Sequence, residues 1–305
     1  MDGAGLVDKK GHNGIIMVLK EFSVNKQDAF SDFVVRFKRL IDKNPHLIKT
    51  TLSNVFTMRL IGNKTHGDLA EIGISEFINQ FMYDFTSKHV GKDLYRAKEH
   101  EEDIQILNEI TKVVFSISLK AYGDGPLQLS TDKNSSMFPY LKAIGGDEIS
   151  DSPTIEKVFN SVEFSEFGNI NVLPLIYDEK KKRCNILIFD FAKARVETKA
   201  IRLETEGKGR THPVYRFFGI DGNYICEVRY GDAAANALQR GLWTNTKNAL
   251  PYFNSATNGW ISYSDNLILV KLFSYALVST YKGHEEAIAF LVKDIEAQKA
   301  YSTLR

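Results

Sequence analysis

Apolar residues recur at three- and four-residue intervals in the first part of the chain. This spacing lines one face of a helix, and it occurs in residues 28–41 and 46–60, with Asn44-Pro45 between them. It returns in residues 69–81, where Asp68 stands at the position of a helix cap. The pattern therefore predicts that helices come first.

The pattern changes to alternation in a hairpin that we expect over residues 103–122. Its apolar runs, 103–106 and 113–120, are separated by a short polar break. Because successive side chains of a strand point to opposite faces, Ser118 and Lys120 share the polar face of the second run. A lysine is unusual in a strand that is otherwise buried. The hairpin would bring Lys120 to the same end of the sheet as the carboxylate of Asp103.

Beyond a polar stretch at 145–153, which reads as a linker or surface loop, the chain is rich in predicted strands. Apolar runs at 172–177 and 185–191 flank a lysine-rich turn. An antiparallel sheet is predicted from further runs at 194–203, 214–220 and 224–229, with Asp221-Gly222-Asn223 as a hairpin turn. The chain then returns to helix at 267–280 and 284–298.

These elements are compatible with one large domain or with two intimate ones, since 305 residues with 43% hydrophobic content can bury a substantial core. We predict a single domain over 1–305. Its parts are a helical segment over 1–62, a core over 63–145, a sheet-rich part over 170–264 and helices over 265–305.

Composition narrows the class of protein only a little. No apolar run approaches the roughly 20 residues of a membrane helix, and the longest, 267–280, contains Lys271 and reads as a buried helix. The start of the chain has no cleavable signal pattern. Two cysteines, Cys184 and Cys226, favour neither a disulfide framework nor a zinc site, so we expect a reducing cytoplasm. The net charge of +1 indicates no uniformly basic surface.

The predicted hairpin resembles the PD-(D/E)xK nuclease superfamily, and the wider pattern looks like a type II restriction endonuclease within it. In that family an acidic residue begins one strand, an acidic-x-Lys triplet lies on the next, and together they bind magnesium. Asp103 matches the first feature and Ser118-Leu119-Lys120 the second. Serine stands where the family has Asp or Glu, and a serine cannot supply the second negative charge.

A replacement carboxylate is expected from the preceding helix, because family members often carry a metal-binding glutamate beside the catalytic hairpin. The candidates are Glu71 and Glu76, which project in different directions. We favour Glu71, which follows the capped first turn. The alternative is that both are solvated acids of the helix.

The resemblance implies an α/β (α+β) fold with a mixed central sheet flanked by helices and an antiparallel extension. It also implies Mg²⁺-dependent hydrolysis of double-stranded DNA at a short specific site, as part of a restriction-modification system in a prokaryotic cytoplasm. A palindromic site would match a homodimer. Asp103, Ser118 and a helix glutamate would hold magnesium, while Lys120 would orient the nucleophile or stabilise negative charge.

Two other classes remain compatible with the sequence. A DNA repair or recombination nuclease would share the metal-binding residues but recognise structure or damage. A non-catalytic DNA-binding protein is favoured by the missing acid at position 118.

A second triplet matches the family pattern literally. Asp190 is followed by Glu197-Thr198-Lys199, with glutamate in place. The run around it is rich in charged residues, and we expect a solvated or DNA-facing ribbon there. We therefore prefer the hairpin of Asp103 and Lys120, with Asp190, Glu197 and Lys199 as the alternative centre.

The segment 227–248 is the best candidate for reading DNA, because it concentrates side chains that bind base edges and phosphates. These are Arg229, Asn236, Gln239, Arg240, Asn245, Lys247 and Asn248. Residues 233–240 are also compatible with a helix capped by Asp232. Gln128 and Ser130, beyond the strand of Lys120, are candidates to bind phosphate or orient water, or are ordinary loop residues. We expect Trp243 and Trp260 to pack rather than to stack on bases.

Overall fold

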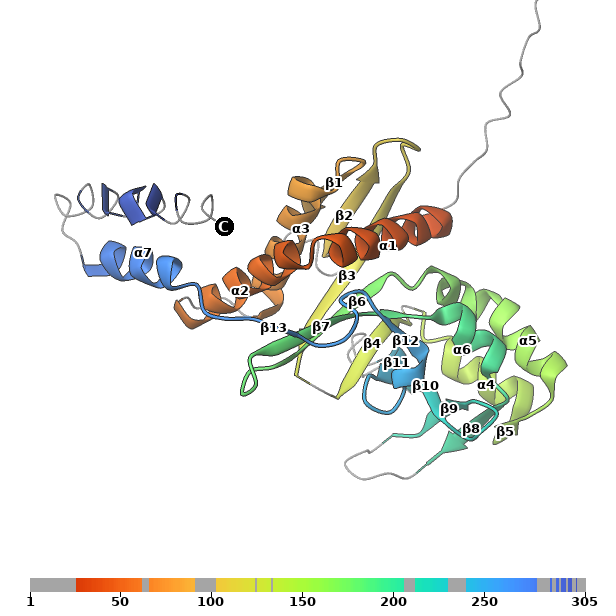
Figure 1. Cartoon of the computed structure of the whole chain (residues 1–305). Coiled ribbons are helices and arrows are strands. Elements are labelled where there is room, and N and C mark those ends of the chain that lie inside the picture. Colours follow the sequence, from red (N-terminus) through yellow and green to blue (C-terminus); the bar gives the residue numbers. More distant parts are fainter. Residues whose placement is uncertain are drawn as a thin grey trace, which may run out of the picture.

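Two β-sheets with helices around them make up the computed structural model (Figure 1). It describes residues 26–61, 66–90, 103–123, 125–132, 134–205, 212–229 and 240–278, together with a few positions between 286 and 300. The chain is therefore of mixed α/β class, as expected. No helix in these described ranges is long and apolar enough to cross a membrane.

The three predicted N-terminal helices are confirmed as α1 (Lys26–Lys43), α2 (Pro45–Ile61) and α3 (His66–Phe81). Their apolar faces meet in a first core that is rich in phenylalanine. Phe33 stacks on Phe37 at 5.5 Å between ring centroids, and Phe37 meets Phe77 of α3 edge to face at 5.7 Å. Helix α3 packs in turn on strands of the first sheet.

The first sheet is mixed. Its strands, in spatial order, are β1 (Phe85–His89), β2 (Ile104–Asn108), β3 (Val114–Tyr122), β6 (Val172–Asp178), β7 (Arg183–Phe189) and β12 (Phe253–Ser255), and β13 (Ile261–Ser262) also pairs with β7. Strands β3 and β6 run parallel, and the other neighbours are antiparallel. The predicted hairpin over 103–122 is thus confirmed as β2 and β3.

The second sheet is antiparallel throughout. Its strands, in spatial order, are β4 (Pro126–Thr131), β11 (Gly241–Asn245), β10 (Tyr224–Arg229), β9 (Val214–Phe218), β8 (Ala200–Glu204) and β5 (Glu148–Ile149). The predicted turn at 221–223 joins β9 to β10, and Gly222 adopts a φ of 72°, which glycine tolerates without steric cost.

Strands β6 and β7 join two hydrophobic cores, because both of their faces are buried. Leu173 and Leu175 of β6 point into the first core with α1–α3, whereas Val172 and Ile176 point into a second core. That second core lies under the second sheet. Its helices are α4 (Met137–Gly145), α5 (Ser152–Asn160), α6 (Phe191–Glu197), η1 (Val162–Asn169) and η3 (Leu250–Tyr252).

Three local predictions were wrong. Residues 191–197 form helix α6 rather than the start of a strand, because Asp190 caps a helix there, and the strand begins only at Ala200. The expected linker at 145–153 contains β5, which pairs with β8. The polar loop expected after Lys120 becomes strand β4, whose Leu127 and Leu129 alternate into the second core.

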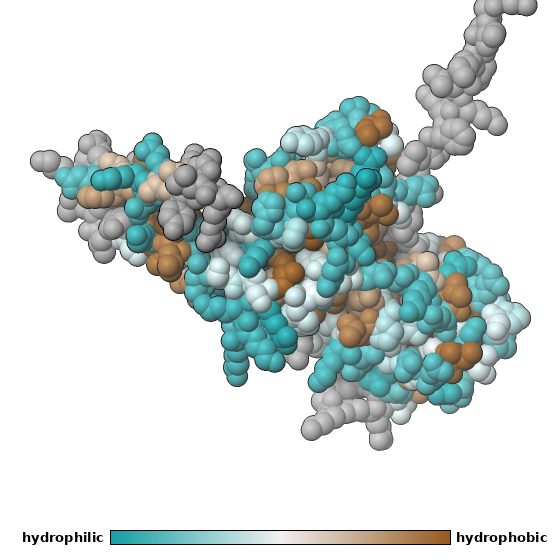
Figure 2. Space-filling view, in the orientation of Figure 1, coloured by the Kyte–Doolittle hydropathy of each residue, from teal (hydrophilic) through white to brown (hydrophobic). Residues whose placement is uncertain are grey.

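Helix α7 (Leu267–Val278) was predicted to be buried, and this was also wrong. None of its described side chains is buried, and Leu267 is 70% exposed. The helix contacts α2 and projects from the body of the molecule (Figure 1), and apolar residues appear on its surface (Figure 2). The predicted helix at 284–298 lies largely outside the described residues.

Gly241 permits the close pairing of β11 with β4. It has a φ of 112°, and an added Cβ would lie 2.2 Å from the Ser130 carbonyl oxygen and 2.6 Å from the Asp132 nitrogen. Because both obstacles are backbone atoms, Gly241→Ala should lower the free energy of unfolding by about 2 kcal/mol or more. Urea denaturation would measure this loss. Gly259→Ala, at a positive φ with open space around it, is the control for backbone strain alone.

His66 links the start of α3 to the first sheet and should make stability depend on pH. Its ring stacks on Tyr177 at 4.4 Å, and its Nε2 lies 2.8 Å from a Glu179 carboxylate oxygen. Burial lowers the pKa of His66, although Glu179 opposes the shift. The unfolded chain therefore binds this proton more strongly, so stability is lost as the pH falls below about 6.5.

His66→Phe retains an aromatic ring and removes the proton. Between about pH 7.5 and about pH 5.5 the melting temperature of this variant should fall less than that of the wild type. The exposed His46 of α2 provides a control, since His46→Gln should follow the wild type. Equal pH dependence in the wild type and His66→Phe would contradict this prediction.

Candidate active site

The carboxylate of Asp103 gathers three donors from the neighbouring strand. Its Oδ2 accepts hydrogen bonds from Ser118 Oγ at 2.9 Å, from the Leu119 backbone N–H at 2.8 Å and from Lys120 Nζ at 3.5 Å. The Asp103 side chain is 15% exposed and that of Lys120 is 39% exposed. The structure thus brings together the three hairpin residues that the sequence singled out.

Strand register explains this meeting. Ile104 pairs with Ile117, so the next residues outward, Asp103 and Ser118, lie opposite each other. The Asp103 carbonyl oxygen accepts a hydrogen bond from the Val90 N–H, which follows β1, at 3.1 Å. The Asp103 carboxylate also has a structural role, because it accepts a hydrogen bond from the Leu119 N–H just beyond the last β2–β3 pair.

The site occupies the face of the first sheet that is turned away from α3. Ile117 and Leu119 point into the first core with the helices, and Ser118 and Lys120 alternate to the opposite face. Tyr122, two residues beyond Lys120, packs against the second core. The polar group therefore lies on the side of the sheet that holds the second sheet.

Glu71 does not lie with this group. It is buried on α3, and its Oε2 is 3.0 Å from Nε2 of His89 on β1. His89 pairs with Ile104 and so shares the helix-facing side of the sheet, whereas Asp103 points to the other side. Among the residues that the structure describes, no group of three His, Cys, Asp or Glu side chains is placed to hold a metal ion.

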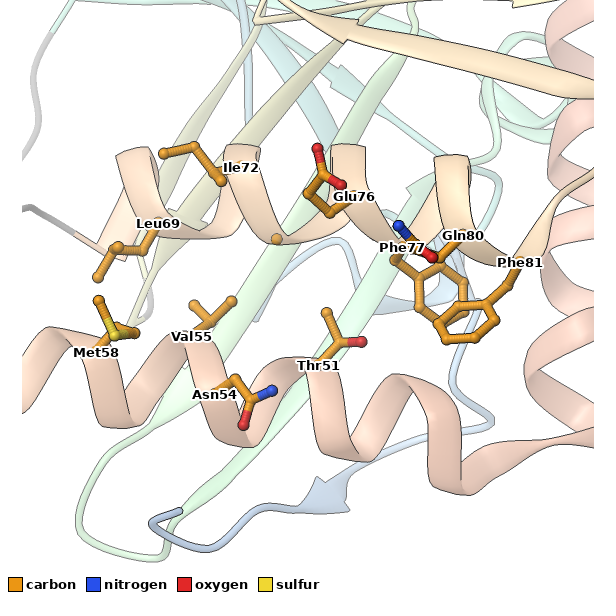
Figure 3. Close-up of a pocket in the computed structure, with 11 residues that line it drawn as sticks. Thr51, Asn54, Val55, Met58, Leu69, Ile72, Glu76, Phe77, Gln80 and Phe81 are labelled. Carbon is orange, nitrogen blue, oxygen red and sulfur yellow. The ribbon is translucent and has the colours of Figure 1, made fainter. Parts of the chain in front are cut away.

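Glu76 also lies apart from this group, on the face of α3 that meets α2. It is exposed, and it lines an apolar groove of 430 Å³ between the two helices with residues such as Val55 and Met58 (Figure 3). A helix turns by about 100° per residue, so five residues separate Glu76 from Glu71 by roughly 140°. Neither glutamate of α3 therefore replaces the acid that is missing at position 118.

The alternative triplet is not assembled either. Asp190 caps α6 by accepting a hydrogen bond from the Lys193 N–H at 2.9 Å, and Glu197 ends this seven-residue helix. At 1.5 Å per residue the two positions are about 10 Å apart along the axis. Lys199 follows the helix, and its Nζ lies 3.5 Å from the Val196 carbonyl oxygen.

The residues proposed to contact DNA gather along β4, β10, β11 and the turn that follows. Gln128 donates from Nε2 to the Arg240 carbonyl oxygen at 3.0 Å, whereas Ser130 Oγ is buried and has no hydrogen-bond partner among the residues that the structure describes. Asn245 accepts at Oδ1 from the backbone N–H groups of Lys247 and Asn248, at 3.0 and 3.2 Å. Asn236 and Gln239 lie outside the described residues.

One arrangement on the second sheet was missed from the sequence. Glu227 of β10 is buried between Arg216 of β9 and Arg229. The available signal was a glutamate and an arginine at alternate positions of an otherwise apolar strand, which places both on one face.

Adding the missing acid should create a metal site. In Ser118→Asp two carboxylates would adjoin at the position where Ser118 Oγ is 2.9 Å from Asp103 Oδ2. In EDTA their repulsion should lower the free energy of unfolding by about 1 kcal/mol or more, and with it the melting temperature by several degrees. Mg²⁺ should restore the melting temperature. Differential scanning fluorimetry with and without Mg²⁺ would measure both effects.

Ser116→Asp is the matched control for this experiment. Ser116 lies on the same face of β3 but pairs with Gln105 rather than with Asp103. Its melting temperature should respond to Mg²⁺ no more than that of the wild type. An equal response in both variants would refute the pairing of positions 103 and 118 as a metal site.

Comparison of the chain with models of protein families, with curated proteins and with solved structures finds no match.

Proposed function

We propose that this protein is a Mg²⁺-dependent endonuclease that hydrolyses phosphodiester bonds of double-stranded DNA at a short specific sequence, in the manner of type II restriction endonucleases. The observation that carries the proposal is the contact of Asp103 with both Ser118 and Lys120 at the end of the β2–β3 pair. These are the positions at which the PD-(D/E)xK resemblance expects its metal-binding and lysine residues.

The architecture supports the same proposal. A mixed first sheet carries α1–α3 on one face, and an antiparallel second sheet extends it. A mixed sheet with helices is compatible with the fold that the resemblance implies, and the polar face of β3 lies on the side of the second sheet, whose strands carry Gln128, Ser130, Arg229 and Asn245.

The donor set fits a magnesium ion bound through a single protein carboxylate. All three hydrogen bonds described for Asp103 go to Oδ2, so Oδ1 remains for a cation, and Ser118 offers a second oxygen. Magnesium is often held by one or two carboxylates together with substrate phosphate oxygens and water. When bound, the ion would lower the pKa of a bound water and offset charge on the scissile phosphate.

Lys120 is suited to contact the scissile phosphate or the attacking water. Its Nζ is 3.5 Å from the Asp103 oxygen, longer than the 2.7–2.9 Å or so of a strong charge-assisted hydrogen bond. The ammonium is therefore only loosely engaged, and its half-exposed position lets it donate to substrate. In this role it stabilises negative charge that develops during hydrolysis.

DNA binding and a homodimer form part of the same proposal. Lys247 and Asn248 are exposed at the end of the second sheet and are available to contact phosphates. A protein that cuts a palindromic site binds it with two-fold symmetry, so two copies of the chain would act together.

A non-catalytic DNA-binding protein is the second candidate, and one observation favours it. Position 118 supplies a hydroxyl rather than a carboxylate, and no described residue replaces the missing charge. Asp103 is also engaged with the Leu119 N–H, which gives it a structural reason to be present.

Cleavage of unmethylated phage DNA would separate the two candidates. The wild type should give discrete fragments in Mg²⁺ and none in EDTA. The cleavage rate of Lys120→Ala should be lower than that of the wild type by a factor of about 100 or more, because one charge-stabilising donor is lost at the reacting phosphate. Gel electrophoresis of timed digests would measure the rates.

Lys199→Ala, in the triplet that the fold does not assemble, is the control and should cut like the wild type. Loss of activity in Lys199→Ala alone would move the centre away from Asp103. A wild type that protects a DNA sequence from footprinting but never cuts it would favour the non-catalytic candidate.

A further inference from the structure

A polar pocket of 280 Å³ is hollowed into the second sheet, at β9, β10 and the turn after β11. The buried carboxylate of Glu227 lies in its wall. Its Oε2 accepts from Arg216 Nε at 3.2 Å, and its Oε1 accepts from Arg229 Nε at 2.8 Å. Glu227 therefore holds two guanidinium groups side by side, and Arg216 is held further by Glu204, whose Oε2 lies 2.8 Å from Arg216 Nη1.

Two contacts fix both the position and the orientation of the Arg229 guanidinium group. Its guanidinium lies 4.0 Å from the ring centroid of Trp243, and its Nε is bonded to Glu227. No described residue accepts a hydrogen bond from its terminal nitrogens. A fixed guanidinium whose terminal N–H groups meet no acceptor in the described part of the chain is suited to bind a planar acceptor or an anion in a bidentate manner.

A β-bulge completes the pocket. The register between β9 and β10 shifts between Tyr224 and Cys226, which brings Tyr224 onto the face of Glu227. Bulges of this kind re-aim side chains beside functional sites. Burial raises the pKa of the Tyr224 hydroxyl, so it remains a neutral hydrogen-bond donor at ordinary pH.

The remaining lining combines an aromatic ring with amides. Phe218 supplies an apolar wall, and Asn245 and Asn248 supply amide groups. Because Asn245 Oδ1 is engaged by backbone N–H groups, its NH₂ group remains to donate. Aromatic surface, amides and paired arginines in one small hollow match a flat heteroaromatic ring that carries hydrogen-bonding groups and an adjoining anion.

We propose that this pocket binds one nucleotide in an unstacked state, with its base against the aromatic wall and its phosphate at Arg229. A phosphate alone would use the arginines and leave Phe218 and Tyr224 without a role. Unstacked bases are bound in this way elsewhere, by stacking on side chains and by hydrogen bonds to their edges.

A short stretch of chain connects the pocket with the strand that carries Lys120. Pro126, at the start of β4, lines it, and Tyr122 at the end of β3 donates from its hydroxyl to Thr246 Oγ1 at 3.0 Å. The inference rests on the proposed function in one respect, namely that the nucleotide belongs to the DNA on which the protein acts.

Tryptophan fluorescence gives a direct test in EDTA, where no cleavage takes place. The chain has two tryptophans, so Trp260→Phe leaves Trp243 behind Arg229 as the single reporter. The four deoxynucleoside monophosphates and inorganic phosphate are titrated separately. Saturable fluorescence change with at least one nucleotide, at concentrations where phosphate has no effect, is the expected result.

Two variants in this background locate the binding. Arg229→Ala should weaken nucleotide binding about tenfold or more, because a charged hydrogen-bond donor is lost. Asn248→Ala should weaken it severalfold and, since this side chain is exposed, should not affect folding. Arg183→Ala is the matched control. Like Arg229, Arg183 pairs with a carboxylate, that of Asp178, and packs over an aromatic residue, at position 260, but it belongs to the first sheet.

Three results would overturn the inference: no fluorescence change with any nucleotide, an equal change with phosphate alone, or binding unaffected in both Arg229→Ala and Asn248→Ala. Its failure is distinct from that of the proposed function. A protein that cuts DNA but binds no nucleotide refutes the pocket alone, and one that binds nucleotides but never cuts DNA refutes the nuclease alone.

Discussion

The burial of β6 and β7 on both faces is the constraint on which the rest of the fold depends. Alternate residues of these strands enter different cores, so each strand must be apolar along nearly its whole length. One core needs helices α1–α3 to cover it, and the other needs the second sheet with α4–α6. Both halves of the molecule are therefore organised around one pair of strands, and β3 is placed by its parallel pairing with β6.

A structural role and the proposed chemical role rest on one carboxylate, that of Asp103. The last N–H of β3 that faces β2 would lack a partner without it, so Asp103 completes the edge of the ladder. The same geometry aligns Ser118 and Lys120 on the polar face. Removing the carboxylate therefore disturbs the strand pair as well as any chemistry, which is why the lysine is the sharper position at which to probe activity.

Much of this organisation was readable from the sequence, because strong periodicity specifies elements and faces. The helices over 28–81, the hairpin of Asp103 and Lys120, and the turn at 221–223 were all predicted correctly. Helix α6 was missed because a capping aspartate before seven residues gives a weaker signal than the charged alternation that imitates a strand. Glu71 lies on the other side of the sheet from Asp103, which the sequence could not indicate, because helical spacing says which residues share a face but not which side of a sheet that helix covers. The alternation of Glu227 with Arg229 was visible in the sequence, but the approach of Arg216 depends on the register of β9 with β10, which no local pattern contains.

The short connection between β3 and β4 has a mechanical consequence. One stretch of backbone leaves the first sheet at Tyr122 and enters the edge of the second at Pro126, and the Tyr122–Thr246 hydrogen bond secures it. The second sheet is therefore tied directly to the strand that bears Lys120. If a ligand binds at each sheet, as proposed above, any coupling between the two would pass through this connection, and by thermodynamic reciprocity each ligand would change the affinity for the other by the same factor.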